Sequence, residues 1–370
     1  MERTLLLPLL LACFASSATL CAGQSPSALP PWARDVDALF APGDRPDTPG
    51  CALGVIQDGR LTYTRGYGQA SLEHSVPITA RTVFDIGSTS KQFTAAAIGL
   101  LVQDGKLGVE DEIHDWVPEL APWDEDVTLD QMLHHTSGIP DYLGLMMRTG
   151  IDEADLTTPA QALEHLARVQ KLLFPPGSRY EYSNSNYFLL SLVIEHASGQ
   201  PFQEFARQRL FEPLGMTSTL LFHDHALVVP HRATGYAVRK GGGFQVAMSD
   251  FEQLGDGAVQ TSVEDLAKWD ANFYSWKVGG EALRQFLHAP GKLSDGKAIE
   301  YARGLMIDQF RGLARVSHGG AWAGFRAQLM RFPEQRTSIV LLCNRADMNP
   351  NALCEQVAGI VLAQQMKSER

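Results

Sequence analysis

The hydrophobic residues of this chain follow strand-like spacing near both ends and helix-like spacing in the middle. At the N-terminal side, residues 32–40 predict a short helix. The runs 52–56 and 61–67 predict a hairpin that turns at Asp58-Gly59, because Asp-Gly favours the tight turns of hairpins. Toward the C-terminus, residues 350–364 predict an amphipathic helix. Four further runs before that helix predict strands: 303–307, 314–318, 326–332 and 338–343.

The middle of the chain, from about residue 81 to residue 257, is rich in helical spacing, for example at 159–169 and 188–196. A third segment carries apolar side chains three and four positions apart, namely Phe93, Ala96, Ala97, Leu100 and Leu101. This spacing predicts one apolar stripe on an amphipathic helix, and Gly105 is a typical stop signal after it.

Strands at both ends of the sequence around a helical middle favour an α+β fold. We expect one antiparallel β-sheet flanked by terminal helices, formed by residues 30–80 and 258–370. Residues 81–257 are expected to form an inserted, mostly helical domain.

The first 23 residues are typical of a secretory signal peptide. Arg3 supplies the positive end, residues 5–14 are apolar, and small residues follow at Ala18 and at 21–23. Ten apolar residues are too few to span a bilayer, so we expect a periplasmic or secreted protein with no membrane span. The alternative is a lipid anchor at Cys13, since residues 10–13 resemble a lipobox.

Composition narrows the classes of partner. The 370 residues are 45% hydrophobic, which is typical of a globular protein, and carry a formal net charge of −11 with no basic cluster. This charge argues against binding to nucleic acid or to an anionic membrane surface. We expect a small-molecule or peptide substrate instead.

The sequence GSTSK at residues 87–91 is the first sign of chemistry. Three residues are close to one helical turn, so Ser88 and Lys91 lie on the same face. A serine is a weak nucleophile until a base takes its proton, and a desolvated lysine can be that base. Taken alone, the pattern also fits a polar first turn with a solvated lysine.

Two further segments strengthen the interpretation of residues 87–91 as a catalytic motif. Tyr182 and Asn184 form a Tyr-x-Asn pair just before an apolar helix. The sequence SHGGA at 317–321 interrupts what the pattern predicts as an edge strand, and its glycines, including Gly320, would let a substrate backbone approach the main chain.

In this order and spacing, Ser-x-x-Lys, Tyr-x-Asn and His-x-Gly resemble the serine β-lactamase and penicillin-binding-protein superfamily. The class C β-lactamase-like branch, with its related esterases, D-aminopeptidases and DD-carboxypeptidases, is the most similar. The resemblance runs from about Cys51 to the C-terminus and includes MLHHTSGIP (132–140), FEPLGM (211–216) and QTSVEDLAKW (260–269). It implies a β-lactamase/transpeptidase-like fold, with the active site in the cleft between the sheet and the helical domain.

The resemblance also implies roles for individual residues. Ser88 is the nucleophile, and Lys91 and Tyr182 are both catalytic, although either of them could hold the serine proton. Asn184 orients substrate and Lys91, and the backbone N–H groups of Ser88 and Ala321 form an oxyanion hole.

His318 stands where the β-lactamase pattern has lysine, which resembles the peptidase and D-aminopeptidase branches more. We expect it to contact a substrate carboxylate or Tyr182, with a charge that switches near neutral pH. Tyr142 is expected to contact substrate side chains. Asn349 either binds an anionic group or caps the last helix, and His135 is expected to be a structural hydrogen-bonder beneath the site.

The family fold would bring Cys51 and Cys343 into one sheet. A bridge between them is one reading, but our expectation is two buried free thiols. We take His223, Asp224, His225 and His231 as part of an exposed polar loop rather than a metal site.

No Gly-x-Ser-x-Gly elbow occurs, which argues against an α/β-hydrolase. We expect an exported serine hydrolase that acts through a Ser88 acyl-enzyme, without metal or organic cofactor, on short acyl esters or amides or on D-amino-acid peptides. The alternatives are a β-lactamase and, in another class, a penicilloyl-binding sensor that is acylated but does not turn over.

Overall fold

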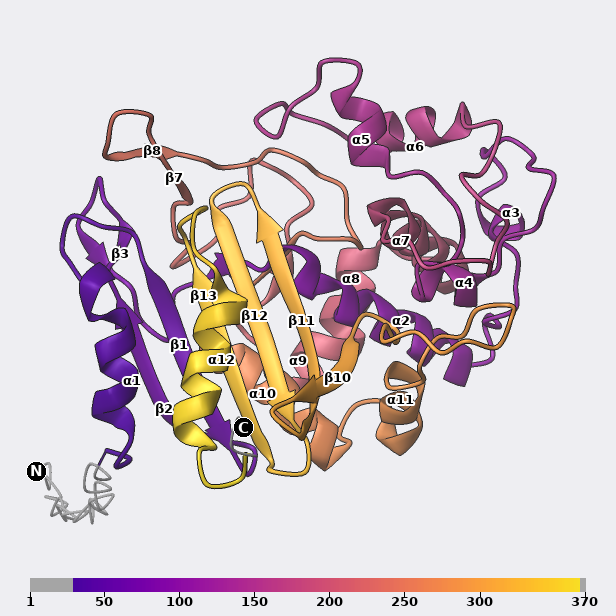
Figure 1. Ribbon diagram of the computed structural model, residues 1–370. Coiled ribbons are helices and arrows are strands. Elements are labelled where there is room, and N and C mark those ends of the chain that lie inside the picture. Colours follow the sequence, from indigo (N-terminus) through magenta and orange to yellow (C-terminus); the bar gives the residue numbers. More distant parts are fainter. Residues whose placement is uncertain (1–28, 367–370) are drawn as a thin grey trace, which may run out of the picture.

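The computed structural model describes residues 29–366, and its centre is a six-stranded antiparallel sheet (Figure 1). The strand order is β10-β11-β12-β13-β1-β2, so strands from both ends of the sequence meet at the β13–β1 pair. The bounds are β1 (Cys51–Gln57), β2 (Arg60–Tyr67), β10 (Met306–Phe310), β11 (Leu313–Trp322), β12 (Phe325–Phe332) and β13 (Thr337–Cys343).

The predicted hairpin and the strands predicted at 314–318, 326–332 and 338–343 are confirmed, whereas the run 303–307 is strand only from residue 306, where β10 begins. β1 and β2 turn at Asp58 and Gly59, which both have positive φ, as a two-residue hairpin turn requires. The sequence pattern missed two details. β11 continues through the two glycines instead of being interrupted by them, and it lies second from the edge because β10 covers part of it.

The two faces of the sheet bury different sets of side chains. One face packs against α1 (Ala33–Phe40) and α12 (Pro350–Val361), which lie together over β13, β1 and β2 (Figure 1). Along β1, Leu53 and Val55 face these helices, whereas Ala52 and Ile56 belong to the larger core on the other face. Burial on both faces explains why β1 and β13 are continuous apolar runs.

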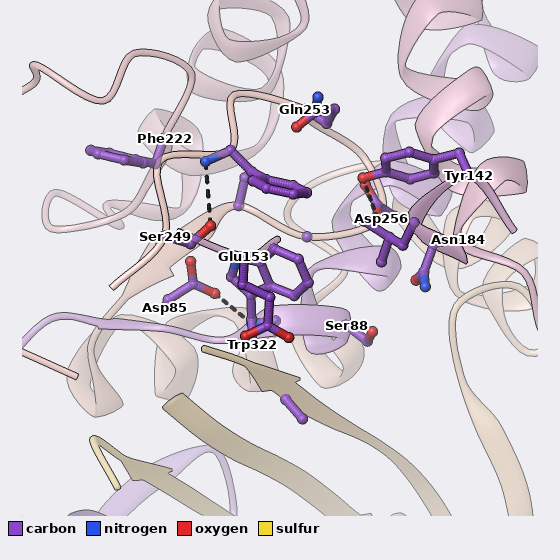
Figure 2. A pocket seen from close by; sticks show the side chains of 16 residues that line it. Asp85, Ser88, Tyr142, Glu153, Asn184, Phe222, Ser249, Gln253, Asp256 and Trp322 are labelled. Atoms are coloured by element: carbon purple, nitrogen blue, oxygen red, sulfur yellow. Dashed lines mark hydrogen bonds between the residues drawn. The ribbon is translucent and has the colours of Figure 1, made fainter. Parts of the chain in front are cut away.

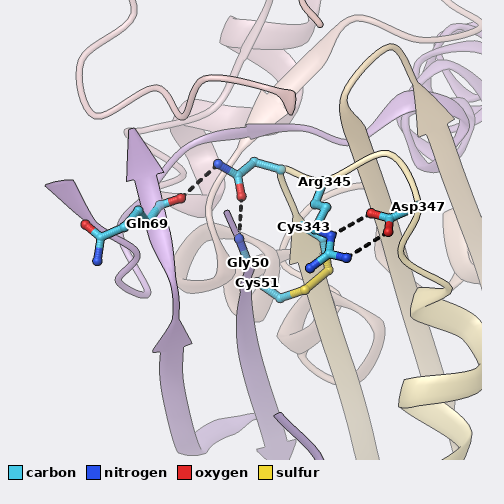
Figure 3. Close-up of a disulfide and its surroundings, with 7 residues drawn as sticks. Gly50, Cys51, Gln69, Cys343, Arg345 and Asp347 are labelled. Atoms are coloured by element: carbon cyan, nitrogen blue, oxygen red, sulfur yellow. Dashed lines mark hydrogen bonds and ion pairs between the residues drawn. A yellow bond between two sulfur atoms is a disulfide. The ribbon is translucent and has the colours of Figure 1, made fainter. Parts of the chain in front are cut away.

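A disulfide joins β1 to β13. Cys51 and Cys343 are directly paired across the two strands, and their Cα atoms are 4.0 Å apart (Figure 3). The expectation of two free thiols was therefore wrong: periodicity places both cysteines in strands, but not opposite one another. Cys354 on α12 is free and buried.

The larger core is built around α2 (Lys91–Gln103), which follows a 3-10 turn, η2 (Gly87–Ser90). All side chains from Lys91 to Leu101 are buried, so this helix is central and not amphipathic as predicted. It ends just before Gly105, as predicted, and Gly99 allows α11 (Gly280–Leu287) to pack closely. A Cβ at Gly99 would lie 2.7 Å from Leu283 Cδ1.

The other helices cover α2 and the second face of the sheet. Their bounds are α3 (Ile113–Trp116), α4 (Leu129–Leu133), α5 (Tyr142–Met147), α6 (Pro159–Ala167), α7 (Asn184–Ser198), α8 (Phe202–Ala206), α9 (Glu212–Leu214) and α10 (Val263–Ser275), with the 3-10 helix η1 (Ala41–Gly43) and the π-helical η3 (Arg207–Phe211). The short strands are β3 (Gln69–Ser71), β4 (Val76–Pro77), β5 (Phe84–Asp85), β6 (Leu220–Leu221), β7 (Tyr236–Val238), β8 (Phe244–Val246) and β9 (Val259–Thr261).

The α+β architecture predicted from the sequence is confirmed. Among the helices of residues 29–366, none is long and apolar enough to cross a membrane. The predicted signal peptide and the alternative lipid site at Cys13 lie outside the described residues.

Candidate active site

Ser88 lies in η2, wedged between the start of α2 and the end of β11. The contact between η2 and β11 depends on glycine at two positions. A Cβ at Gly87 would lie 2.8 Å from the Ala321 nitrogen, and Gly87 has a φ of +47°. A Cβ at Gly320 would lie 1.8 Å from the Ile86 carbonyl oxygen. These glycines let the two backbones touch, which places Ser88 beside Ala321.

The strand pairing determines which side of β11 the Ala321 N–H faces. Trp322 and Phe325 flank a two-residue hairpin loop and form a hydrogen-bonded pair, so Ala321 and Arg326 form the next, non-hydrogen-bonded pair. The Ala321 N–H thus points away from β12. β10 begins at Met306, opposite Ser317, so within the described residues no strand covers Ala321 on that side. Ala321 therefore lies beside Ser88 with an edge free of strand pairing, and the oxyanion hole formed by their N–H groups stays a prediction.

Lys91 is fully buried one turn after Ser88. Its Nζ donates to Ser88 Oγ at 3.1 Å, to Asn184 Oδ1 at 2.8 Å and to the Asp256 backbone carbonyl at 2.6 Å. Burial lowers the pKa of the Lys91 amine to about 8, while the negative charges of Asp256 and Asp141 act to raise it. The amine is thus available in its neutral form in mildly alkaline solution.

Tyr182 lies two residues before the start of α7, with Lys91 Nζ 4.9 Å from the centre of its ring. Desolvation raises the pKa of the Tyr182 phenol above its usual range, and a hydrogen bond with Ser88 acts against this rise. The phenol is therefore protonated at neutral pH. Of the two groups, Tyr182 holds its proton more firmly and Lys91 releases its proton more easily.

Asp141 fixes the orientation of Asn184. Its Oδ2 accepts from the Asn184 backbone nitrogen at 2.6 Å and from Asn184 Nδ2 at 2.9 Å, so Asn184 Oδ1 is left to face Lys91. Asp141 also caps α5 through Leu143. The sequence reasoning missed Asp141, although an aspartate that follows Ile139-Pro140 is a recognisable N-cap signal.

Asp256 is a second residue that was missed. It is buried beside Lys91, and its Oδ2 accepts from the Tyr142 hydroxyl at 3.1 Å. Burial raises the pKa of the Asp256 carboxyl, and the Lys91 charge acts against this rise. Nothing in the local pattern marks this aspartate, because it lies in a loop between β8 and β9 that only the fold brings to Lys91.

His318 is placed differently from expectation. Its Nδ1 bonds the Gly319 carbonyl oxygen at 2.7 Å, and its Nε2 lies 3.1 Å from the Tyr301 hydroxyl. Because a carbonyl only accepts, Nδ1 carries the proton and Nε2 accepts from Tyr301. Burial, together with the Lys91 charge, lowers the pKa of His318 to about 4. The expected switch of charge near neutral pH is therefore wrong: this histidine is a neutral, buried group at the site.

His135 packs against the aromatic side of the site. Its ring centre lies 4.2 Å from that of Tyr182, and its Nδ1 accepts from the Ser183 backbone and from Asn186 Nδ2, both at 3.2 Å. This matches the expected structural hydrogen-bonding role. Its Nε2 is buried without a hydrogen-bond partner and faces a group of tyrosine rings that includes Tyr187 and Tyr301.

Tyr142 and Asn349 both reach the site region. Tyr142 is buried in α5 and lines a cavity next to Ser88. Its hydroxyl donates to Asp256. Asn349 caps α12, because its Oδ1 accepts from the Ala352 nitrogen at 3.1 Å. This agrees with the capping alternative, and Asn349 also lines the second cavity described below.

Two cavities meet at Ser88 and Ala321. The first, of about 210 Å³, lies between η2, α5 and the loop after β8 (Figure 2). The second, of about 460 Å³, is lined by Tyr180, Tyr182, Tyr301 and His318, and by the open edge of β11. A substrate whose scissile carbonyl reaches Ser88 can therefore place one part in the first cavity and the other part in the second.

The expected exposed loop is only partly exposed: His225 and His231 are exposed, whereas His223 and Asp224 are half-buried. Within it, His225 Nδ1 bonds Glu252 Oε1 at 2.8 Å, and Asp224 lies close enough for these three groups to share a cation. Exposed acidic groups commonly gather in this way without a metal.

Comparisons with known proteins identify the family to which the chain belongs. A sequence model of the family described as "Beta-lactamase" matches residues 36–359. The chain is 28% identical over 307 residues to penicillin-binding protein 4* of Bacillus subtilis, covering 79% of this chain and 67% of that protein. It is 30% identical over 296 residues to a D-aminopeptidase of Brucella anthropi, covering 80% of this chain but only 56% of the enzyme. The chain therefore spans little more than half the length of that relative.

Solved structures show the same fold. A penicillin-binding protein homologue from Pyrococcus abyssi superposes with a TM-score of 0.78 at 27% identity, over 90% of this chain and 77% of that one. The D-amino acid amidase of Ochrobactrum anthropi SV3 superposes with a TM-score of 0.74 at 21% identity, over 90% and 99% of the two chains. The similarity to the amidase indicates the fold alone.

Proposed function

The chain belongs to the β-lactamase family of serine hydrolases, and we propose that Ser88 is the residue through which it forms an acyl-enzyme. The observation that carries this proposal is the hydrogen bond between Lys91 Nζ and Ser88 Oγ, made by a lysine that is fully buried. A nucleophile and a base within hydrogen-bond reach, with the base oriented by a third group such as Asn184, are typical of activated serines.

In the proposed acylation step, neutral Lys91 accepts the Ser88 proton while Oγ forms a bond to the substrate carbonyl carbon. The carbonyl oxygen becomes negative and is stabilised by the N–H groups of Ser88 and Ala321. The tetrahedral intermediate then expels the alcohol or amine, which receives a proton from the network of Tyr182 and Lys91. In deacylation, a water molecule gives a proton to the same network and attacks the acyl carbon. The bond between this carbon and Ser88 Oγ then breaks, Oγ recovers its proton, and the carboxylic acid product leaves.

The charge states favour Lys91 as the group that takes the serine proton. Its pKa is lowered by burial, whereas that of Tyr182 is raised, so a tyrosinate base would have to form against desolvation. We infer that Tyr182 acts as a phenol that passes a proton to the leaving group.

Short acyl esters or amides and D-amino-acid peptides are the proposed substrates. The names of the relatives, D-aminopeptidase and penicillin-binding protein, support this class. The neutral His318, at a position where the β-lactamase pattern has lysine, offers no permanent charge for a β-lactam carboxylate. β-Lactam hydrolysis is therefore the second candidate.

We also propose that the protein is exported. The disulfide between Cys51 and Cys343 supports an oxidising compartment, such as the periplasm or the exterior.

A panel of p-nitrophenyl esters, D-aminoacyl anilides and nitrocefin, with Ser88→Ala as the control, tests the proposed function. Turnover that depends on Ser88 supports a hydrolase. A single burst of one product equivalent per enzyme, with no steady state for any substrate, would instead identify a sensor that is acylated without turnover.

A further inference from the structure

The first cavity at Ser88 has an unusual balance of charge. Its lining includes three carboxyl groups, from Asp85, Glu153 and Asp256, and no lysine, arginine or histidine among the described residues. Figure 2 labels Asp85, Glu153 and Trp322 among the residues that line the cavity, and it shows Asp256 beside Tyr142. Asp256 is already engaged by the Tyr142 hydroxyl, which leaves Asp85 and Glu153 as the available acceptors.

Asp85 is held in a defined orientation three residues before Ser88. Its Oδ1 accepts from the Gly87 nitrogen at 2.7 Å, and no hydrogen bond of the described residues uses its Oδ2. The side chain is buried, with 8% of the residue exposed. Oδ2 is not fully buried, so it is open to the cavity and can accept a hydrogen bond from a ligand.

Glu153 is exposed at the rim of the cavity, in the loop between α5 and α6. Arginines lie near both carboxylates but outside the lining. Arg232 stacks on the Phe222 ring at 4.1 Å, and Arg326 donates to the backbone carbonyls of Ala323 and Phe325. Arg232 attracts Asp85 and Arg326 attracts Glu153 electrostatically, but within the described chain no hydrogen bond or ion pair joins either arginine to these carboxylates. Both carboxylates therefore keep oxygen atoms that can accept from a ligand.

Aromatic rings complete the wall. Phe251 and Trp322 meet edge to face with ring centres 5.1 Å apart, and both line the cavity with Phe222. Aromatic faces attract cations, and this attraction grows when water is excluded. The second cavity has the opposite balance, because its lining includes Arg326 and no carboxylate.

We propose that the first cavity binds a protonated primary amine of the substrate, recognised by Asp85 and Glu153 against the rings of Phe251 and Trp322. This inference rests on the proposed function, because it names the kind of substrate that Ser88 would attack. An ammonium offers three donors and a full charge, which suits two carboxylates and an aromatic wall. The amine is either the α-amino group of an aminoacyl substrate or an amine at the end of a longer acyl chain.

Two matched pairs of substrates test the proposal and separate these sources. D-Phenylalanine p-nitroanilide is compared with 3-phenylpropionic p-nitroanilide, which lacks only the amino group. p-Nitrophenyl 6-aminohexanoate is compared with p-nitrophenyl heptanoate, in which a methyl group replaces the ammonium. In at least one pair we expect the amine to raise kcat/KM by about tenfold or more, the usual effect of a charged hydrogen bond. The pair that responds identifies the position of the amine.

Charge-neutralising variants then assign the residues. Asp85→Asn keeps an acceptor for the Gly87 nitrogen, and Glu153→Gln changes only a rim residue. Each is expected to lower the amine-to-neutral ratio of kcat/KM severalfold. Glu110→Gln, which removes an equal charge from an exposed site outside the cavity lining, should leave the ratio unchanged.

Direct binding separates a failure of this inference from a failure of the proposed function. Titration calorimetry at pH 7 compares phenethylamine, which is protonated, with 2-phenylethanol and needs no turnover. Tighter binding of the amine, weakened in Asp85→Asn or Glu153→Gln, supports the ammonium site even if hydrolysis fails. Equal binding of the two compounds, or an amine preference that neither variant reduces, would overturn it.

Discussion

Lys91 Nζ lies 3.1 Å from Ser88 Oγ in a fully buried position, and its two other hydrogen bonds run to the Asn184 amide oxygen and the Asp256 backbone carbonyl. Both of these groups only accept in this geometry, so they favour the lysine as a donor, whereas burial favours its neutral form. The balance between the two effects sets the pH at which the serine is activated.

Activity should therefore depend on the ionisation of Lys91. The base works when deprotonated, so kcat/KM for a neutral ester should rise with pH and level off above the Lys91 pKa of about 8. The Asp256 charge raises that pKa, so Asp256→Asn should move the rise to lower pH. A pH–rate profile of both proteins checks this, and an unchanged midpoint in the variant would contradict the coupling.

Lys91 and Tyr182 should behave as one proton network. Lys91→Ala and Tyr182→Phe are each expected to lower kcat by about a hundredfold or more, which is typical of general acid–base groups. The double variant should lose much less than the product of the two single effects. Steady-state kinetics of the four proteins provide the test, and strictly multiplicative losses would show that the two residues act independently.

His318 should not act as a pH switch for anionic substrates. With its pKa lowered to about 4, it is neutral at both pH 8 and pH 6. We expect kcat/KM for p-nitrophenyl acetate to exceed that for benzylpenicillin, with a ratio that stays the same between these pH values, because the Lys91 ionisation affects both substrates equally. A ratio that moves toward penicillin at pH 6, and does so only while His318 is present, would restore the imidazolium hypothesis.

The Cys51–Cys343 disulfide should contribute to stability, since it closes a long loop between the two ends of the chain. Loss of such a bond typically costs about 2–4 kcal/mol of unfolding free energy. The double variant Cys51→Ser and Cys343→Ser should therefore melt several degrees lower. Peptide mapping without reduction should recover the linked pair, and two free thiols in protein purified from an oxidising compartment would contradict the bond.

The sequence predicted the sheet and its hairpins well because strands with alternating or continuous apolar runs and Asp-Gly turns carry a local signal. It predicted α2 as amphipathic from the apolar stripe that begins at Phe93, which leaves polar residues such as Gln92 and Thr94 on the other side of the helix. In the structure these side chains are buried and satisfied, since Gln92 bonds Trp269 and Thr94 bonds the Gly255 carbonyl. A buried polar residue with a distant partner cannot be distinguished from an exposed one by periodicity.

The site residues also divide into those that a local sequence signal predicts and those that only long-range contacts reveal. The motif residues Ser88, Lys91, Tyr182 and Asn184 could be proposed from spacing and resemblance, and the structure brings them together. Asp141 and Asp256 could not, because their importance comes from long-range contacts with Asn184, Lys91 and Tyr142. The neutral state of His318 could not be predicted either, since it depends on burial in the folded sheet and on the charge of Lys91.

The central claim is that Ser88 is the acylated nucleophile, and intact-protein mass spectrometry after reaction with a fluorophosphonate tests it most directly. The wild-type protein should gain one adduct, which peptide mapping places on Ser88. Ser88→Ala should gain none and lose ester hydrolysis while it keeps its melting temperature within about a degree or two, because this half-exposed hydroxyl contributes little packing. An adduct that persists in folded Ser88→Ala, or one that maps to another residue, would contradict the account.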